Sequence, residues 1–239
     1  MKNPTLKLQL KFSLPAQPPD TGCSEEADER GTRDGYLRIM KPSRMTVITL
    51  LLTLPLTGRT QSAPARTAAP LVVGSMAPAF KGKDATGRPV ELTQLLKKGP
   101  VVLYFYRGQW CPYCNKQLSQ LQDSLQLLTA KGAQVVVITP ETQENISKTV
   151  AKTKAAFPIV QDQGFIIMTA YRTAFTVDPA TVLKYKGFGV DLQKANDSAD
   201  DVLPVPATYV IGRDGRIKFT YFNPDYRRRV SVRRVAAAL

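Results

Sequence analysis

The residues best suited to chemistry in this sequence are two cysteines three positions apart, Cys111 and Cys114, with Pro-Tyr between them. Two thiols at this spacing can form a disulfide, so that one acts as a nucleophile and the other resolves the product. A thiol at a helix N-terminus ionises more easily, because unpaired N–H groups and the helix dipole favour a thiolate. The spacing therefore predicts a redox pair.

Other chemistries are limited by the composition. The 239 residues include no histidine and only three cysteines, which excludes Ser-His-Asp triads, Cys-His dyads and histidine sites for zinc or haem. A zinc site would need two more ligands, and only Cys23 remains. We therefore expect no metal and no other cofactor. The alternative to a redox pair is two buried structural cysteines.

Two side chains just before the pair are candidate site residues. Arg107 can stabilise a thiolate or bind oxygen atoms of a substrate, or it can be an ordinary surface arginine. Trp110 can contact substrate or serve only as a packing residue. No carboxylate lies between residues 101 and 110, so this stretch offers no acid for proton transfer to the pair.

A strand and a helix must position the pair. Residues 101–106 (VVLYFY) form a continuous apolar run, which is typical of a strand covered on both faces. The helix after the pair is marked by leucines at steps of three, four and three: Leu118, Leu121, Leu125 and Leu128. We expect this helix to end at Gly132.

Strands and helices alternate through the rest of the chain, which favours an α/β sandwich with a mostly parallel sheet. Further strands are expected at residues 90–92, 133–139, 207–211 and 217–222, with a hairpin turn at 213–216. Further helices are expected at residues 141–156, 165–175 and 231–239.

The net charge of +14 comes from 33 basic and 19 acidic residues. Five of the basic residues lie in one tail: Arg227, Arg228, Arg229, Arg233 and Arg234. Such a run can bind nucleic acid or an anionic surface. Because no nucleic-acid-binding motif accompanies it, we interpret it as a solvated terminus and expect no nucleic-acid partner.

The first 65 residues divide into two segments. Residues 1–39 are polar and without periodicity, which indicates a disordered or mis-annotated leader. Residues 40–65 combine a basic start, an apolar run at 46–58 and an Ala-x-Ala site at 63–65, as in a secretory signal. If translation starts near Met40, the protein is periplasmic or secreted. The run is too short for a stable membrane span. The alternative is a buried segment or a single anchor.

Residues 101–121 (VVLYFYRGQWCPYCNKQLSQL) resemble the redox motif of the thioredoxin superfamily. They are more closely similar to the peroxiredoxin-like branch of the alkyl hydroperoxide reductase C/thiol-specific antioxidant family. Supporting matches lie at residues 74–80 (GSMAPAF), 137–141 (VITPE) and 206–211 (PATYVI), with Asp214-Gly215. The resemblance covers about residues 71–239. It implies a thioredoxin-like sandwich, with a central mixed sheet of about five strands flanked by helices.

The chain departs from the family pattern Pro-x-x-x-Thr-x-x-Cys. Arg107 stands in the proline place, Cys111 in the threonine place and Cys114 in the place of the peroxidatic cysteine. The later arginine of the family is replaced by Pro206. In thioredoxins a proline there is usually cis and contacts the partner chain. We therefore expect a cis Pro206 that binds substrate; the alternative is an ordinary proline at the entry of a strand.

The resemblance implies a thiol-based antioxidant enzyme that reduces peroxides and is regenerated by an external thioredoxin-like dithiol. The alternative is a periplasmic thiol–disulfide oxidoreductase acting on protein cysteines. In thioredoxins the cysteine at the start of the helix attacks, which here is Cys111. The position of the peroxidatic cysteine in the peroxiredoxin pattern is occupied here by Cys114. We expect Cys111, because the outer thiol should be more exposed and nearest the helix dipole. No pattern indicates the oligomeric state.

Overall fold

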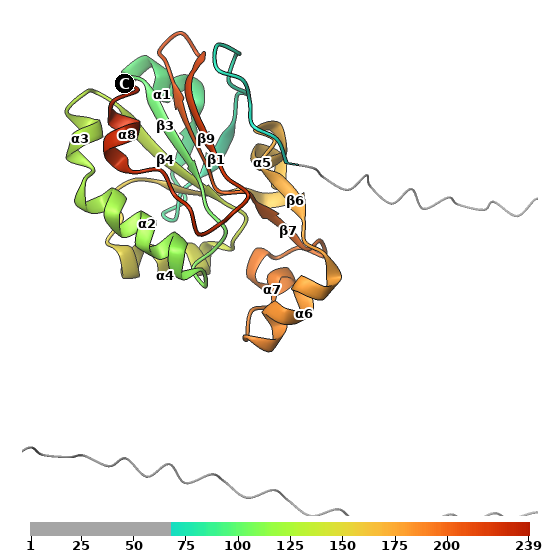
Figure 1. Cartoon of the computed structure of the whole chain (residues 1–239). Coiled ribbons are helices and arrows are strands. Elements are labelled where there is room, and N and C mark those ends of the chain that lie inside the picture. Colours follow the sequence, from blue (N-terminus) through green and yellow to red (C-terminus); the bar gives the residue numbers. More distant parts are fainter. Residues whose placement is uncertain (1–67) are drawn as a thin grey trace, which may run out of the picture. The chain divides into compact units, whose positions relative to one another are not determined.

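The computed structural model describes residues 68–239. The expected leader at residues 1–39 and the expected secretory signal at residues 40–65 lie outside this range. No helix within residues 68–239 has the length and apolar character needed to cross a bilayer. The described residues form a layered α/β structure (Figure 1).

The central sheet has five strands in the order β5-β4-β3-β8-β9. The strands are β3 (Val101–Phe105), β4 (Gln134–Thr139), β5 (Ile159–Gln161), β8 (Ala207–Ile211) and β9 (Ile217–Phe222). The first three are parallel to one another, while β8 pairs antiparallel with both β3 and β9. The predicted mixed sheet is therefore confirmed. Strand β3 is central and buried at every position, which explains its wholly apolar sequence.

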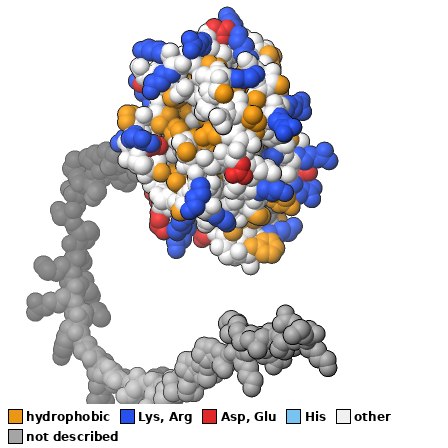
Figure 2. All heavy atoms as spheres, turned by 90° about the vertical axis from the view of Figure 1, so that its left-hand side faces the viewer, with side chains coloured by type: hydrophobic (Ala, Val, Ile, Leu, Met, Phe, Trp, Pro, Cys, Tyr) orange, Lys and Arg blue, Asp and Glu red, His pale blue; other side chains and the backbone are white. Residues whose placement is uncertain are grey.

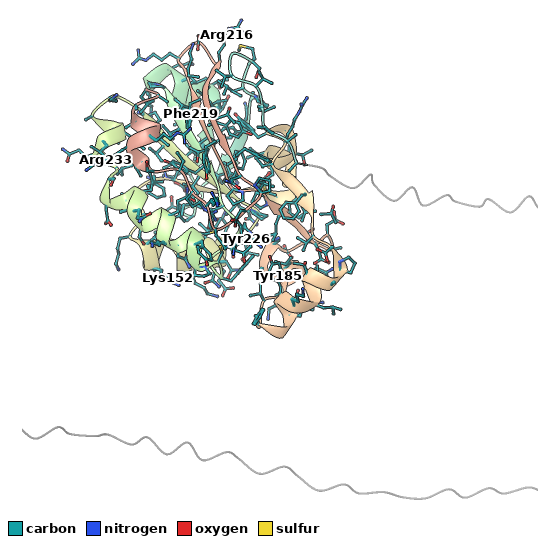
Figure 3. All side chains as sticks on the ribbon, viewed as in Figure 1. Lys152, Tyr185, Arg216, Phe219, Tyr226 and Arg233 are labelled. Carbon is teal, nitrogen blue, oxygen red and sulfur yellow. The ribbon has the colours of Figure 1, made fainter. Side chains whose placement is uncertain are left out.

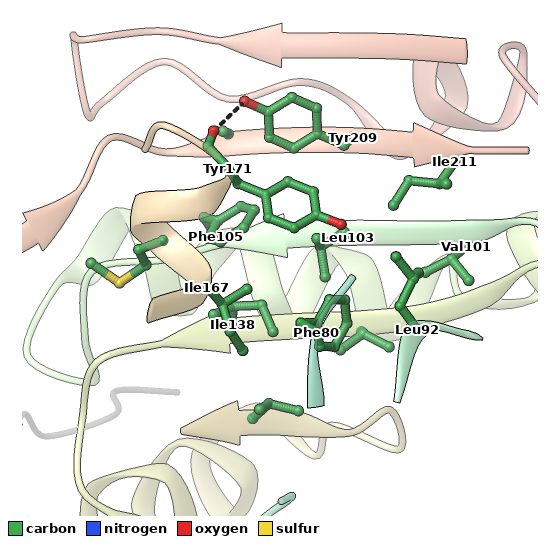
Figure 4. Packing of buried hydrophobic residues seen from close by; sticks show 14 of the residues in the cluster. Phe80, Leu92, Val101, Leu103, Phe105, Ile138, Ile167, Tyr171, Tyr209 and Ile211 are labelled. Carbon is green, nitrogen blue, oxygen red and sulfur yellow. Dashed lines mark hydrogen bonds between the residues drawn. The ribbon is translucent and has the colours of Figure 1, made fainter. Parts of the chain in front are cut away.

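Helices cover both faces of this sheet (Figure 1). One face packs against α1 (Leu92–Lys98) and α5 (Ile166–Ala170). Figure 4 shows its core, in which Phe80 and Phe105 lie near Tyr171 and Tyr209. The other face, called here the thiol face, packs against α2 (Pro112–Asp123), α3 (Gln126–Thr129), α4 (Gln143–Thr153) and α8 (Val232–Ala236).

Two smaller antiparallel pairs complete the structure. Strands β1 (Lys81–Lys83) and β2 (Pro89–Glu91) form a hairpin. Strands β6 (Ala174–Thr176) and β7 (Val202–Pro204) carry a helical excursion between them, formed by α6 (Pro179–Gly187) and α7 (Leu192–Asn196). The excursion has a small apolar core of its own: Val177, Val182, Leu192 and Leu203.

Two helix predictions are wrong in part. The leucine-marked helix is broken, because α2 ends at Asp123 and Ser124 leaves the helical region before α3 begins. Residues 165–175 begin at the last residue of the 3-10 turn Gln163–Phe165, continue through the short α5, and end in strand β6. The chain reverses at Arg172, which has a φ of 54°. The partner of β6 lies about 28 residues away along the chain, in β7, where a local pattern does not indicate it.

Charge is spread over the surface. Figure 2 shows one face of the molecule, on which Lys and Arg side chains are scattered between uncharged and apolar groups. Of the tail arginines, Arg227, Arg228, Arg233 and Arg234 are exposed, as expected for a solvated terminus. Arg229 is half-buried and differs from its neighbours.

Candidate active site

The two cysteines lie where β3 ends and α2 begins. Cys111 is the N-cap residue of α2, and Pro112 occupies the first helical turn, where a missing N–H is tolerated. Cys114 lies one turn further, and its backbone N–H donates to the Cys111 carbonyl at 3.1 Å. Both thiols are free. The expected greater exposure of Cys111 is wrong: the two residues are 1% and 0% exposed, because both pack into the core of the thiol face.

The two thiols differ in acidity. Burial opposes ionisation of Cys114, but a hydrogen bond from Cys111 and the charge of Arg229 hold the pKa of Cys114 below its ordinary value. The hydrogen bond to Cys114, together with burial, raises the pKa of Cys111 well above its ordinary value. Ionisation of the reduced pair is therefore favoured at Cys114 over Cys111.

Arg229 reaches the pair from the C-terminal segment between β9 and α8. Its Nη2 atom donates to Cys114 Sγ at 3.5 Å, and its Nη1 atom donates to the carbonyls of Tyr226 and Arg228. The neighbouring Val230 is buried in the thiol face, which anchors this stretch of chain. For this arginine the interpretation as part of a solvated terminus is wrong.

Arg107 follows β3 and is only 3% exposed, so the surface-arginine alternative is wrong. Its Nη2 atom donates to the hydroxyl of Tyr185. The guanidinium carbon lies 4.3 Å from the ring centre of Tyr226, 5.0 Å from that of Trp110 and 5.4 Å from that of Tyr185. Its charge opposes the rise in the pKa of Cys111 that the Cys114 hydrogen bond and burial cause.

These rings come from three parts of the chain. Trp110 belongs to the loop before α2, Tyr185 to α6, and Tyr226 to the C-terminal segment. Figure 3 shows Tyr185 and Tyr226 close together at the side of the sheet where the excursion begins. The sequence-predicted residues Arg107 and Trp110 are thus brought together, while the two tyrosines were missed because nothing local marks them.

An apolar cavity of about 410 Å³ lies beside Arg107. Its lining includes Phe175, Val177, Val205, Pro206, Tyr185 and Tyr226. Pro206 therefore lies next to the site, as expected, but the expected cis bond is wrong: residues 68–239 contain no cis peptide bond. The Val205 N–H donates to the Thr173 carbonyl at 2.8 Å, and the chain runs directly from β7 into β8. An extended path of this kind accommodates a trans bond.

Glu141 is a site residue that the sequence analysis missed. It follows β4, is 0% exposed, and accepts from the Gln109 N–H at 2.7 Å and from the Tyr106 hydroxyl at 3.5 Å. Burial raises the pKa of its carboxyl to about 8; the Gln109 N–H opposes this rise and the charge of Cys114 adds to it. Its place in the sequence could have indicated the site. Strands β3 and β4 are parallel and end at the same edge of the sheet, so a residue just after β4 lies near the loop that follows β3.

Gly108 has no room for a side chain. A Cβ atom there would lie 2.8 Å from Glu141 Oε1 and would collide with the indole of Trp110. The glycine thus lets the loop before the cysteines pass over the buried carboxyl.

Residues 73–220 match the sequence pattern of the AhpC/TSA family. The chain belongs to the AhpC/TSA family. Its class of activity is therefore that of a peroxiredoxin-family thiol peroxidase.

Individual proteins agree with this assignment. The chain is 32% identical over 150 residues to the chloroplastic peroxiredoxin Q of Sedum lineare, an alignment covering 63% of this chain and 68% of that protein. The crystal structure of peroxidoxin BcpB from Mycobacterium tuberculosis superposes with a TM-score of 0.55 at 19% identity, covering 70% of this chain and 94% of that one. A peroxiredoxin-like protein from Aquifex aeolicus also gives 0.55, at 12% identity, with 72% and 87% covered. The structural neighbours show the shared thioredoxin-like fold.

Arg229 lies outside the region of this AhpC/TSA family member that matches the family pattern. The matched region ends at residue 220, and the arginine that contacts Cys114 is nine residues further on. The guanidinium beside the thiol is thus supplied by a segment outside the matched region.

Proposed function

We propose that the chain reduces hydroperoxides with Cys114 as the attacking thiolate and Cys111 as the resolving thiol. This order reverses the expectation from thioredoxin logic and follows the peroxiredoxin count. The observation that carries it is the pair of donors aimed at Cys114: the Cys111 thiol and the Arg229 guanidinium at 3.5 Å. Thiolate is the reactive form of cysteine.

The proposed cycle has three steps. The Cys114 sulfur gives an electron pair to the outer peroxide oxygen, the O–O bond breaks, and the alkoxide leaves as an alcohol after taking a proton. The Cys111 sulfur then attacks the resulting sulfenic acid, forming a disulfide and releasing water. A thioredoxin-like dithiol returns two electrons and two protons to the pair.

The two arginines have separate roles in this proposal. Arg229 contacts the attacking sulfur and stabilises its charge, since charge-assisted hydrogen bonds are the stronger kind. Arg107 lies among aromatic rings and lines the cavity, where it can bind a peroxide oxygen.

Single-cysteine variants test the order of attack. Cys111→Ser should react once with a stoichiometric hydroperoxide and accumulate a sulfenic acid, which a trapping dione labels on Cys114. Cys114→Ser should not react. Mass spectrometry after proteolysis locates the label, and a label on Cys111 in the Cys114→Ser variant would reverse the assignment.

The contact of Arg229 with Cys114 can be tested against a matched control, the adjacent Arg228. Arg229→Gln should slow alkylation of Cys114 near neutral pH by about tenfold, because a pKa higher by one unit lowers the thiolate fraction by that factor. The difference should vanish at high pH. Arg228→Gln changes an exposed neighbour and should match the wild type. Equal alkylation rates in the two variants would show that Arg229 does not stabilise the Cys114 thiolate.

A second candidate function is thiol–disulfide exchange with other proteins, in the periplasm if the secretory signal operates. The apolar cavity beside Arg107, with Pro206 in its wall, supports it because an extended partner segment could dock there. Oxidation of a reduced protein substrate by the disulfide form, at a rate above that of peroxide reduction, would favour this function. N-terminal sequencing of the protein from its native cell tests the signal.

A further inference from the structure

Glu141 is a buried acid that the proposed cycle does not use. The carboxyl is fully buried, and within residues 68–239 it forms no ion pair with a lysine or arginine. Its Oε2 atom accepts two hydrogen bonds, whereas its Oε1 atom is buried without a partner. A carboxylate in such a place is costly, so the neutral acid is favoured.

The carboxyl is linked to the loop that carries the thiols. It accepts from the Gln109 N–H, and the Gln109 carbonyl accepts from Asn115 Nδ2 at 2.7 Å. Glu141 therefore contacts the loop two residues before Cys111, and that loop is tied in turn to the first turns of α2. Gly108 is needed for the carboxyl to approach this closely.

Few titratable groups face Glu141. Tyr106 donates to it from the end of β3, and Cys114 acts on it electrostatically from α2. Lys148 acts from α4, but its ammonium is exposed and bonded to Glu144 at 2.7 Å. A thiolate at Cys114 and a carboxylate at Glu141 would thus be two negative charges at one largely buried site, which like-charge repulsion disfavours.

We propose that Glu141 holds the second proton of the redox cycle, so that the site carries one negative charge in both oxidation states. In the reduced protein Cys114 is a thiolate and Glu141 is a carboxylic acid. In the disulfide form the charge of Cys114, which raises the pKa of Glu141, is gone, and Glu141 ionises to a carboxylate. The inference rests on the proposed function, in which Cys114 is the attacking thiolate and the pair interconverts between thiol and disulfide. Glu141 is thus the proton donor when the peroxide is reduced and a proton acceptor when the disulfide is reduced.

The protons and electrons balance. When Cys114 attacks the peroxide, the leaving alkoxide takes the proton of Glu141 and departs as an alcohol. Cys111 then attacks the sulfenic sulfur, and its own proton leaves with the hydroxide as water. An external dithiol gives two electrons to the disulfide, one proton to Cys111 and one proton to Glu141. The starting state is restored.

The equilibrium in which dithiothreitol reduces the protein disulfide, measured at several pH values, tests the proposal. In the wild type the dithiol loses two protons and the protein gains two, so the equilibrium constant should be nearly independent of pH in the unit or so below the Glu141 pKa of about 8. The Glu141→Gln protein gains only one proton when its disulfide is reduced. One proton is therefore released to solution, and the equilibrium constant for reduction should rise about tenfold per pH unit. The glutamine is nearly isosteric and can still accept from Gln109. Equal pH dependence in the two proteins would overturn the proposal.

Two further measurements keep the result interpretable. Glu144→Gln removes an exposed carboxyl of α4 and should titrate as the wild type does. If Glu141→Gln fails to fold, the redox difference infrared spectrum of the wild type decides instead: the C=O band of a protonated carboxyl should be present in the reduced protein and lost on oxidation. An unchanged band contradicts the proposal. Absence of any dithiol–disulfide equilibrium in the wild type would instead contradict the proposed function.

Discussion

The two faces of the central sheet treat buried polar groups in opposite ways. On the face covered by α1 and α5, the hydroxyl of Tyr171 donates to the Pro78 carbonyl at 2.8 Å, and that of Tyr209 donates to the Tyr171 carbonyl at 3.1 Å (Figure 4). On the thiol face and around the cysteines, several buried polar atoms have no hydrogen-bond partner: Tyr104 Oη, Arg107 Nε, Trp110 Nε1, Asn115 Oδ1, Glu141 Oε1 and Arg229 Nε.

One face of the sheet mainly stabilises the fold, whereas the other carries the reactive groups. Buried polar groups are nearly always paired, and an unpaired group costs about 1–3 kcal/mol. A concentration of unpaired groups around two thiols indicates that this region gives up stability in order to keep donors and acceptors available. The opposite face supplies the compensating packing. Three predictions test this contrast.

The largest effect is expected at the centre of the satisfied face. Tyr171 is 0% exposed and its ring packs against those of Phe80, Phe105 and Tyr209. Tyr171→Ala should lower the free energy of unfolding by about 3–5 kcal/mol, the range for deleting a buried aromatic side chain. Urea denaturation measures the loss. Alkylation of Cys114 in the folded variant should proceed at the wild-type rate, and a slower rate would mean that the two faces are not separable.

A medium effect is expected from the pH dependence of stability. The pKa of Glu141 is raised from 4.5 to about 8 in the folded protein, so the folded state binds the proton more tightly than the unfolded state. Its contribution to stability is fully present below about pH 4.5 and is lost as pH rises towards 8. Glu141→Gln should therefore remove a downward slope on the order of 1.4 kcal/mol per pH unit within this window.

The slope is measured by urea unfolding of the reduced protein at several pH values. Comparing the variant with the wild type at each pH cancels the contributions of the other groups. Glu144→Gln, which changes an exposed carboxyl, serves as the control. Parallel pH profiles for Glu141→Gln and the wild type would show that the buried carboxyl is not protonated in the folded state.

The smallest effect comes from removing one hydroxyl from each face. Tyr209→Phe loses the bond to the Tyr171 carbonyl and should destabilise the protein by about 1 kcal/mol. Tyr104→Phe removes a hydroxyl that is buried without a partner, so stability should be unchanged or slightly higher. Thermal unfolding of the two variants compares them directly. Equal losses would contradict the proposed division between the faces.

The parts of the fold that could be predicted are those with a strong local pattern. The apolar runs that became β3, β4, β8 and β9 identified the central strands, because a strand buried on both faces must be apolar throughout. The pair of β6 and β7, with α6 and α7 between, could not be predicted. Its strands are three residues long and are stabilised by each other, which local sequence does not show.

The site divides in the same way. Cys111, Cys114, Arg107 and Trp110 lie within eight residues of one another, and a local motif includes them all. Glu141 and Arg229 reach the thiols from the end of the next parallel strand and from the C-terminal segment. Both residues can be read from the sequence, but their proximity to the cysteines depends on the sheet order and on the packing of the C-terminal segment. The acidity of the thiols depends on these distant groups, which neither the expected exposure of Cys111 nor its place at the start of the helix could indicate.

The position of Arg229 also affects how the protein acquires its reactivity. The contact with Cys114 joins residues 115 positions apart in the chain, so it forms only after the C-terminal segment has docked on the thiol face. Until then Cys114 lacks that positive partner, and a thiol in an unfolded chain keeps its ordinary, weakly acidic character. Partly folded chains are accordingly less open to over-oxidation by peroxide than a chain with a preformed thiolate would be. Nucleophilic activation is thus coupled to completion of folding.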